Sequence, residues 1–231
     1  MLIHGLTSTP WEVRPVGVAL REAGFHAESF WLPGHGTRPE DLRGVRWQDW
    51  VQSVEARYDA MLAEHGRVAV LGTSLGGSLA LWLGITRQPT ALVSMGGAVW
   101  LPWPSMLARA MSYLRPFQNK RPEGSAIRDP AARARHPSYR KTSFRAIAEM
   151  RALLAQIKPR LAEIDSPLLV MHGRLDRVIP PGNAEYILMN VSSARKKLLW
   201  FEESDHIITE DYEHAQVAAA AVSWIAERAE G

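Results

Sequence analysis

Short apolar runs alternate with longer segments of helical periodicity along most of this chain. Runs of strand length are found at residues 25–31, 68–71, 91–95, 167–171 and 197–201, and Met1-Leu2-Ile3 reads as the end of another strand. Apolar positions with helical spacing occupy residues 11–23, 47–65, 183–190 and 211–228, and an apolar helix-compatible segment follows residue 74. Strands that alternate with helices predict a mostly parallel sheet flanked by helices on both faces.

This alternation stops between residues 100 and 165, where prolines, clustered arginines and helical patterns replace clear strands. We therefore expect a core made of residues 1–99 and 166–231, with a helical insertion at 100–165. The formal charge of the chain is +3, but residues 101–165 hold thirteen Lys and Arg against five Asp and Glu. We interpret this surplus as the solvated surface of helices; an anion-seeking or membrane-seeking face is the alternative.

Composition limits the classes of protein that remain. With 231 residues, 46% hydrophobic and 22% charged, the sequence predicts one globular domain without a membrane-spanning segment. Zero cysteines exclude disulfides, a thiol nucleophile and thiolate metal sites. No signal-peptide pattern opens the chain, which favours a cytoplasmic location, although a start inside a strand leaves open whether residues precede Met1.

The segment Gly72-Thr73-Ser74-Leu75-Gly76 lies between an expected strand and an expected helix. A Gly-x-Ser-x-Gly sequence in this setting is typical of the tight turn that presents a nucleophilic serine at the end of a strand. The turn strains the serine backbone, so its close neighbours must lack side chains. An ordinary strand-to-helix turn with a capping serine is the alternative interpretation.

A serine hydroxyl needs a base, and the base needs a carboxylate that orients it. His206 follows the last expected strand, where a loop can bring it over Ser74, and we expect it to be the base. Asp176 follows the strand before that one and is the expected carboxylate. Asp205 is the rival, but a residue adjacent to the histidine is poorly placed to accept from its ring. The tetrahedral intermediate also needs N–H donors, for which the backbone amides of Leu75 and Leu6 are the candidates.

Several short motifs occur in an order that resembles a known family. They are His4-Gly5-Leu6-Thr7, Pro33-Gly34-His35-Gly36, Gly72-Thr73-Ser74-Leu75-Gly76-Gly77, Gly173-Arg174-Leu175-Asp176 and Ser204-Asp205-His206-Ile207-Ile208-Thr209. Together they resemble the capped α/β-hydrolase serine esterases, and among these the small bacterial carboxylesterase and monoacylglycerol lipase group. The resemblance covers nearly the whole chain. It implies an α/β-hydrolase fold, a triad of Ser74, Asp176 and His206, and a helical cap over the site.

The expected function is that of a serine carboxylesterase that acts through an acyl-enzyme and needs no cofactor or metal. Short- to medium-chain esters are the expected substrates, with monoacylglycerols as a further candidate. The cap residues expected to offer an apolar surface to the acyl chain are Trp100, Leu101, Trp103, Met106, Leu107, Met111 and Leu114. Ordinary packing between cap and core is the alternative role for each of them.

Three other functions remain as alternatives. The same triad serves hydrolases of thioester, peptide or carbon–carbon bonds. The fold could also persist in a ligand-binding receptor without turnover, although the intact serine, aspartate and histidine count against this. Binding of nucleic acid through the arginine-rich insertion finds no support in aromatic and basic interleaving. Stable membrane insertion is not expected, and the sequence does not indicate an oligomeric state.

Overall fold

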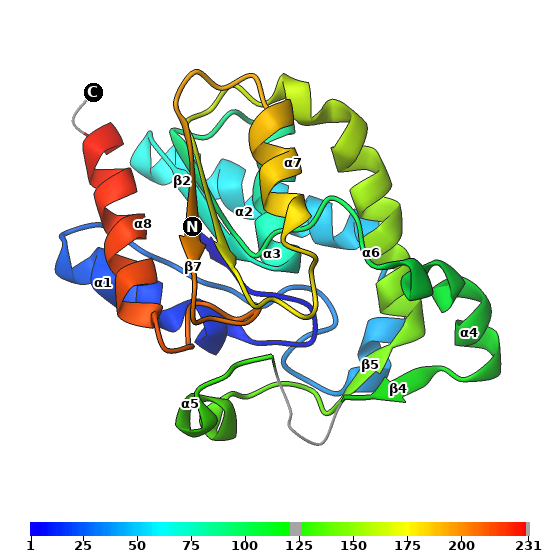
Figure 1. The fold of residues 1–231 in the computed structure, drawn as a ribbon. Helices are drawn as coiled ribbons and strands as arrows, with labels where there is room; N and C mark the ends of the chain where they lie inside the picture. The colour runs from blue at the N-terminus through cyan, green and yellow to red at the C-terminus, as the bar shows by residue number, and fades with distance from the viewer. Residues whose placement is uncertain (121–125, 230–231) are drawn as a thin grey trace.

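The computed structural model describes residues 1–120 and 126–229. Its centre is a five-stranded sheet in the order β1-β2-β3-β6-β7, and every neighbouring pair of strands is parallel (Figure 1). The strands are β1 (Leu2–Ile3), β2 (Ala69–Thr73), β3 (Ala91–Met95), β6 (Leu168–Gly173) and β7 (Lys196–Phe201). The sequence pattern therefore predicted these strands to within two or three residues. Because all five are parallel, their carboxyl ends share one edge of the sheet.

Helices cover both faces of the sheet (Figure 1). On one face α1 (Arg14–Glu22) packs beside α8 (His214–Ala229). The other face is covered by α2 (Trp47–His65), α3 (Leu75–Thr86), α6 (Phe144–Ile157) and α7 (Gly182–Asn190). Consecutive strand residues enter opposite cores, because side chains alternate along a strand. In β3, Leu92 packs with α3 and α6, whereas Val93 packs with α1 and α8.

The segment between β3 and β6 leaves the sheet and returns to it through α6. It contains the 3₁₀-helix η3 (Trp103–Leu107), α4 (Ala108–Leu114), β4 (Phe117–Asn119), α5 (Pro130–Arg135), β5 (Lys141–Ser143), α6 and the 3₁₀-helix η4 (Lys158–Glu163). β4 and β5 pair in antiparallel fashion, so the expectation of a segment without strands is wrong. These strands have only three residues each, which is too short for a period of two to stand out in sequence.

Residues 25–31 also differ from expectation. Instead of a strand they form one isolated bridge, between Ser29 and Leu2, beside the short edge strand β1. Only Ala27 in this run is buried, and the side chains of His26 and Glu28 bond to each other at the surface. An apolar pattern with so little burial does not hold a ladder of hydrogen bonds.

The remaining elements are two 3₁₀-helices in loops at the carboxyl edge of the sheet. They are η1 (Pro10–Val13), which leads into α1, and η2 (Pro39–Arg43), which precedes α2. Among the described residues, no helix has the length and apolar character needed to span a membrane.

Candidate active site

Ser74 is the single residue between β2 and α3. Its backbone has a conformation that L-residues rarely adopt, with φ 54° and ψ −116°. Its amide donates to the carbonyl of Met95 at 2.8 Å, which ties the turn to the neighbouring strand β3. Strain of this kind persists only where the surrounding structure fixes it, and it concentrates at functional sites. The side chain is nearly buried and lines a cavity at the carboxyl edge of the sheet.

Two glycines leave the space that this turn needs. A Cβ on Gly72 would lie 2.1 Å from the carbonyl oxygen of Gly76, and a Cβ on Gly76 would lie 2.1 Å from the carbonyl oxygen of Ile3. Neither separation is possible for real atoms, so strand, turn and helix can approach this closely only with glycine at both positions. The Gly-x-Ser-x-Gly spacing in the sequence is therefore a steric requirement of the observed turn.

His206 lies in the loop after β7, and Asp176 lies in the turn after β6. Nδ1 of His206 donates to Oδ2 of Asp176 at 2.7 Å, and both side chains are buried. The other carboxylate oxygen of Asp176 accepts from the amides of Val178 and Ile179, each at 2.8 Å. With Nδ1 used in this way, Nε2 of His206 is the ring nitrogen left for a reacting group.

His172 is a further partner of Asp176 that sequence reasoning left among several unassigned histidines. Its Nε2 lies 3.0 Å from Oδ2 of Asp176 and 3.1 Å from the carbonyl oxygen of Ile179. A ring nitrogen that faces two acceptors carries the proton, so His172 donates to the carboxylate from the strand side. The four-residue spacing between His172 and Asp176 spans a strand end and a turn, and nothing in the pattern marks the contact.

The buried Asp176–His206 pair shifts both groups towards their charged forms. Burial alone would raise the pKa of Asp176, but His206 and His172 beside the carboxylate bring this pKa well below its usual range. Burial alone would lower the pKa of His206, yet the charge and hydrogen bond of Asp176, with additions from Glu12 and Asp205, raise it above its usual value. The pair is therefore suited to hold an imidazolium when a proton reaches Nε2.

Asp205, the alternative candidate for this carboxylate, forms a different set of contacts. Its side chain is fully buried, accepts from the backbone amides of Arg177 and His206 at 3.0 and 2.8 Å, and pairs with the Arg177 guanidinium. It thus joins the turn after β6 to the loop after β7. The carboxylate bonded to the His206 ring is that of Asp176.

Two backbone amides near Ser74 are without an acceptor among the described residues. One belongs to Leu75, the first residue of α3, and the other to Leu6, in the loop between β1 and η1. The first N–H groups of a helix have no partner within the helix and lie at its positive end. These are the two amides that the sequence nominated as donors for an oxyanion.

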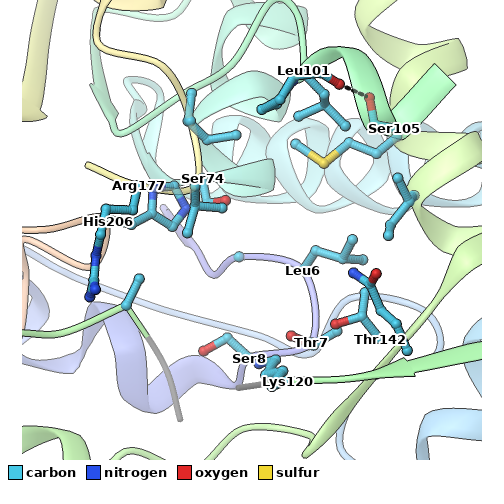
Figure 2. A pocket seen from close by; sticks show the side chains of 18 of the residues that line it. Leu6, Thr7, Ser8, Ser74, Leu101, Ser105, Lys120, Thr142, Arg177 and His206 are labelled. Atoms are coloured by element: carbon cyan, nitrogen blue, oxygen red, sulfur yellow. Dashed lines mark hydrogen bonds between the residues drawn. The ribbon is translucent and has the colours of Figure 1, made fainter. Parts of the chain in front are cut away.

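Ser74 and His206 both line a cavity of about 530 Å³, and Figure 2 shows them on its wall between two chemically different ends. We call the end beside Leu101 and Ser105 the apolar end; it is lined by Leu101, Pro102, Pro104, Ala108, Phe144, Ile147 and Met150. We call the opposite end the polar end; it is lined by Thr7, Ser8, Glu12, Gln118, Lys120, His136 and Thr142. No group of three or more potential metal-ligating side chains among the described residues could hold an ion.

Residues 1–213 match the model of Hydrolase_4, a family of α/β-hydrolases described as serine aminopeptidase, S33. The chain belongs to this family. This α/β-hydrolase is 31% identical over 237 residues to a thermostable monoacylglycerol lipase of Bacillus sp. (strain H-257), a match that covers 99% of the chain and 90% of that lipase. It is 30% identical over 219 residues to a carboxylesterase of Bacillus subtilis (strain 168), covering 92% of the chain and 86% of the relative.

Solved structures give the same fold at lower sequence identity. A structure from a study of LipS and LipT, two metagenome-derived lipolytic enzymes, superimposes with a TM-score of 0.92 at 23% identity and covers 98% of this chain and 92% of its own. A soluble variant of the monoglyceride lipase of Saccharomyces cerevisiae superimposes with a TM-score of 0.86 at 18% identity, covering 98% and 85%. The expected α/β-hydrolase fold and the family resemblance are thereby confirmed.

The expectation for the acyl pocket of this α/β-hydrolase needs correction. None of Trp100, Trp103, Met106, Leu107 and Met111 belongs to the described lining of the cavity. Trp103, Met106 and Leu107 have 71%, 57% and 52% of their surface exposed, and Trp100 packs edge-on against Tyr186 instead. Of the expected residues, Leu101 does line the cavity, together with neighbours that were not expected, such as Ala108, because the direction in which η3 and α4 face is set by tertiary packing.

Glu12 and Lys120 line the polar end and were not singled out from the sequence. The side chain of Glu12 is 1% exposed, and that of Lys120 is mostly buried, which lowers its pKa to about 8. A single charged residue in a helical or loop pattern is most often solvated, so sequence offers no signal for burial at either position.

Proposed function

We propose that this α/β-hydrolase hydrolyses carboxylic esters through an acyl-enzyme formed on Ser74. Ester hydrolysis is supported by the two relatives at about 30% identity, which are named as a monoacylglycerol lipase and a carboxylesterase. The observation that carries the assignment of residues is the bonded Asp176–His206 pair beside a strained serine on the wall of one cavity.

In the first half of the reaction, Oγ of Ser74 attacks the ester carbonyl carbon while Nε2 of His206 takes the hydroxyl proton. The carbonyl π electrons move onto the oxygen to give a tetrahedral oxyanion. When the oxyanion reforms the carbonyl, the bond to the alcohol oxygen breaks and His206 donates its proton to that oxygen. Asp176 keeps the Nδ1 proton in place and stabilises the imidazolium throughout.

In the second half, a water molecule gives a proton to Nε2 of His206 and its oxygen attacks the acyl carbon. The second tetrahedral intermediate then expels Oγ of Ser74, which recovers the proton from His206, and the carboxylic acid leaves. The oxyanion in both halves accepts hydrogen bonds from the amides of Leu6 and Leu75. Donors that are already aimed at this position stabilise charge that develops only in the transition state.

We assign the acyl half and the alcohol half of the ester to the two ends of the cavity. The acyl chain, of short to medium length, lies in the apolar end, and the alcohol lies towards the polar end. Monoacylglycerols combine an alkyl chain with a hydroxyl-bearing alcohol and are candidate substrates. The segment 100–165 acts as a cap, because its residues line both ends of the cavity opposite Ser74.

Replacement of Ser74 by alanine tests the nucleophile. We expect hydrolysis of a p-nitrophenyl ester to fall by at least about a thousandfold, and labelling by a fluorophosphonate to disappear, while the wild type and a Ser53→Ala control on α2 are both labelled. A panel of p-nitrophenyl esters, monoacylglycerols and peptide anilides then separates an esterase from a peptidase. Unchanged labelling of Ser74→Ala, or turnover of the anilides alone, would contradict the proposal.

A further inference from the structure

In the loop between β1 and η1, the backbone amides of residues 5–8 differ in whether they have a hydrogen-bond acceptor. The Gly5 amide donates to Oε2 of Glu12 at 2.5 Å, and the Thr7 amide donates to Nε2 of His35 at 3.1 Å. The Ser8 amide donates to the carbonyl oxygen of Gly5 at 3.2 Å. Only the Leu6 amide in this run lacks an acceptor within the described part of the chain. Two side chains from outside the loop thus hold the amides on either side of the proposed oxyanion donor.

Glu12 is close to the reacting centre although it belongs to the start of η1. A Cβ built on Gly5 would lie 3.0 Å from Oε2 of Glu12 and 3.1 Å from Cβ of Ser74, so Gly5 is in contact with both residues. No cationic side chain forms an ion pair with Glu12 in the described residues. Burial without an ion pair raises the pKa of Glu12 and makes its charged form costly, so the one directed contact of this carboxyl group calls for a specific role.

The charged and titratable groups around Glu12 come from several elements. His136 follows α5, Glu210 lies in the loop before α8, Lys120 follows β4, and His206 is the proposed base. His136 and Glu210 bond to each other at 2.6 Å, and Glu210 also accepts from the indole of Trp11. Glu12 therefore has one directed hydrogen bond, from the Gly5 amide, and the groups around it act through their charges.

His35 supplies the second acceptor through a fixed tautomer. Its Nδ1 faces the carbonyl oxygen of Pro33 at 3.1 Å and must carry the ring proton, which leaves Nε2 as an acceptor for the Thr7 amide. Burial lowers the pKa of His35 to about 4, so the ring stays neutral at neutral pH. Thr7 has φ 66°, an unfavourable value for a β-branched residue, and the bond from its amide helps to hold this conformation.

We infer that Glu12 and His35 are positioning residues that clamp the two peptide units flanking the one that carries the Leu6 N–H, and thereby aim this amide at the oxyanion. This inference rests on the proposed function, because it takes the Leu6 amide to be an oxyanion donor. Fixing the neighbouring amides fixes the direction of the Leu6 N–H, which belongs to the peptide unit between them. Figure 2 shows Leu6, Thr7 and Ser8 along the wall of the cavity near Ser74.

The test compares a transition-state analogue with the substrate. A trifluoromethyl ketone adds Oγ of Ser74 to form a tetrahedral oxyanion, whereas the KM of a p-nitrophenyl ester depends mainly on ground-state contacts. For Glu12→Ala and His35→Ala we expect kcat/KM and the affinity for the ketone to fall together, by about tenfold to a thousandfold each. KM should change less than threefold, as a rough bound, because the lost stabilisation is confined to the transition state.

Conservative variants separate positioning from a general need for these side chains. Glu12→Gln and His35→Gln keep an acceptor at the end of a side chain of similar reach, and both should recover most of the lost ketone affinity. Glu149→Gln is the matched control, since Glu149 is a buried carboxylate that also accepts a backbone amide, from Trp47, but does not line the cavity. Thermal unfolding of every variant shows whether the fold is retained.

Each outcome has a distinct meaning. The clamp is overturned if Glu12→Ala and His35→Ala bind the ketone as tightly as the wild type, or if the glutamine variants lose as much affinity as the alanine variants. If an alanine variant does not fold, the other residue and the glutamine pair still decide. A wild-type protein that forms no adduct with the ketone would contradict the proposed function itself.

Discussion

Oδ2 of Asp176 lies 2.7 Å from Nδ1 of His206, although 30 residues separate the two positions in the chain. The same carboxylate also accepts hydrogen bonds from His172 and from two backbone amides, so it is held from four directions. A carboxylate held in this way cannot rotate to follow the imidazole. The imidazole must instead keep the orientation that directs Nε2 towards the cavity, and four consequences of the site geometry can be measured.

Replacement of Asp176 by asparagine should lower kcat by about a hundredfold to ten-thousandfold. The amide keeps the size of the side chain but removes the negative charge that stabilises the imidazolium, and it can present an N–H to Nδ1, which favours the wrong tautomer. Steady-state kinetics with a p-nitrophenyl ester measures the effect. A variant with more than half of the wild-type kcat and a retained fold would show that His206 does not depend on this carboxylate.

The acid limb of kcat/KM should lie above the ordinary histidine value of about 6.5. A protonated His206 cannot accept the proton of Ser74, and Asp176, Glu12 and Asp205 together hold its pKa above that value, so activity is lost early as the pH falls. Removing one of these charges in Glu12→Gln should lower the pKa, so that the variant keeps its activity to lower pH. A pH–rate profile of both proteins checks the sign, and a shift towards higher pH would contradict it.

Gly76→Ala should lower the free energy of unfolding by about 3 kcal/mol or more. The added Cβ would lie 2.1 Å from the carbonyl oxygen of Ile3, so β1 and α3 must move apart and the contacts between them are lost. Gly44→Ala is the control, because the nearest atom to its Cβ would be 3.9 Å away. Urea denaturation of both variants measures the difference, and equal stability of the two would refute the steric argument.

Ala108→Phe should shift the substrate preference towards shorter acyl chains. Ala108 is 1% exposed and lines the apolar end of the cavity, so a larger side chain at this position takes up volume that a longer chain needs. We expect kcat/KM for an octanoyl ester to fall by roughly tenfold relative to an acetyl ester, in line with the loss of a few methylene contacts. Met106→Ala, on the exposed side of the same segment, should leave the ratio unchanged. Equal ratios in both variants would place the acyl chain elsewhere.

Local chemistry made much of the fold predictable. The strands β2, β3 and β6 are buried over nearly their whole length and therefore appear as continuous apolar runs, which a sequence displays directly. The edge strand β7 is only partly buried, but it ends in the apolar run 198–201. Weak or short elements are harder to predict from the sequence. Residues 25–31 are apolar enough for a strand but lie against the two-residue edge strand β1, and the short strands β4 and β5 depend on each other for their hydrogen bonds.

The residues of the candidate site also differ in whether the sequence could predict them. Ser74 could be found because its turn demands glycines at fixed positions, and Asp176 and His206 because both follow strands that end at one edge of a parallel sheet. The residues that line the cavity could not be found in this way. Trp103 and Met106 are apolar, yet they face solvent, while Ala108 and Met150 line the cavity, because helical spacing defines a face without saying what that face meets.

By itself, the sequence determined the alternation of strands and helices, the strained turn at Ser74, and the chain order of serine, aspartate and histidine. These features depend on backbone sterics and on hydrophobic periodicity, which act between residues close together in the chain. Only the tertiary structure decided that His172 supports Asp176, that Glu12 and His35 hold the loop at Leu6, and which side chains line the cavity. Those contacts join residues that are distant in sequence or separated by turns, and their geometry exists only after the sheet has assembled.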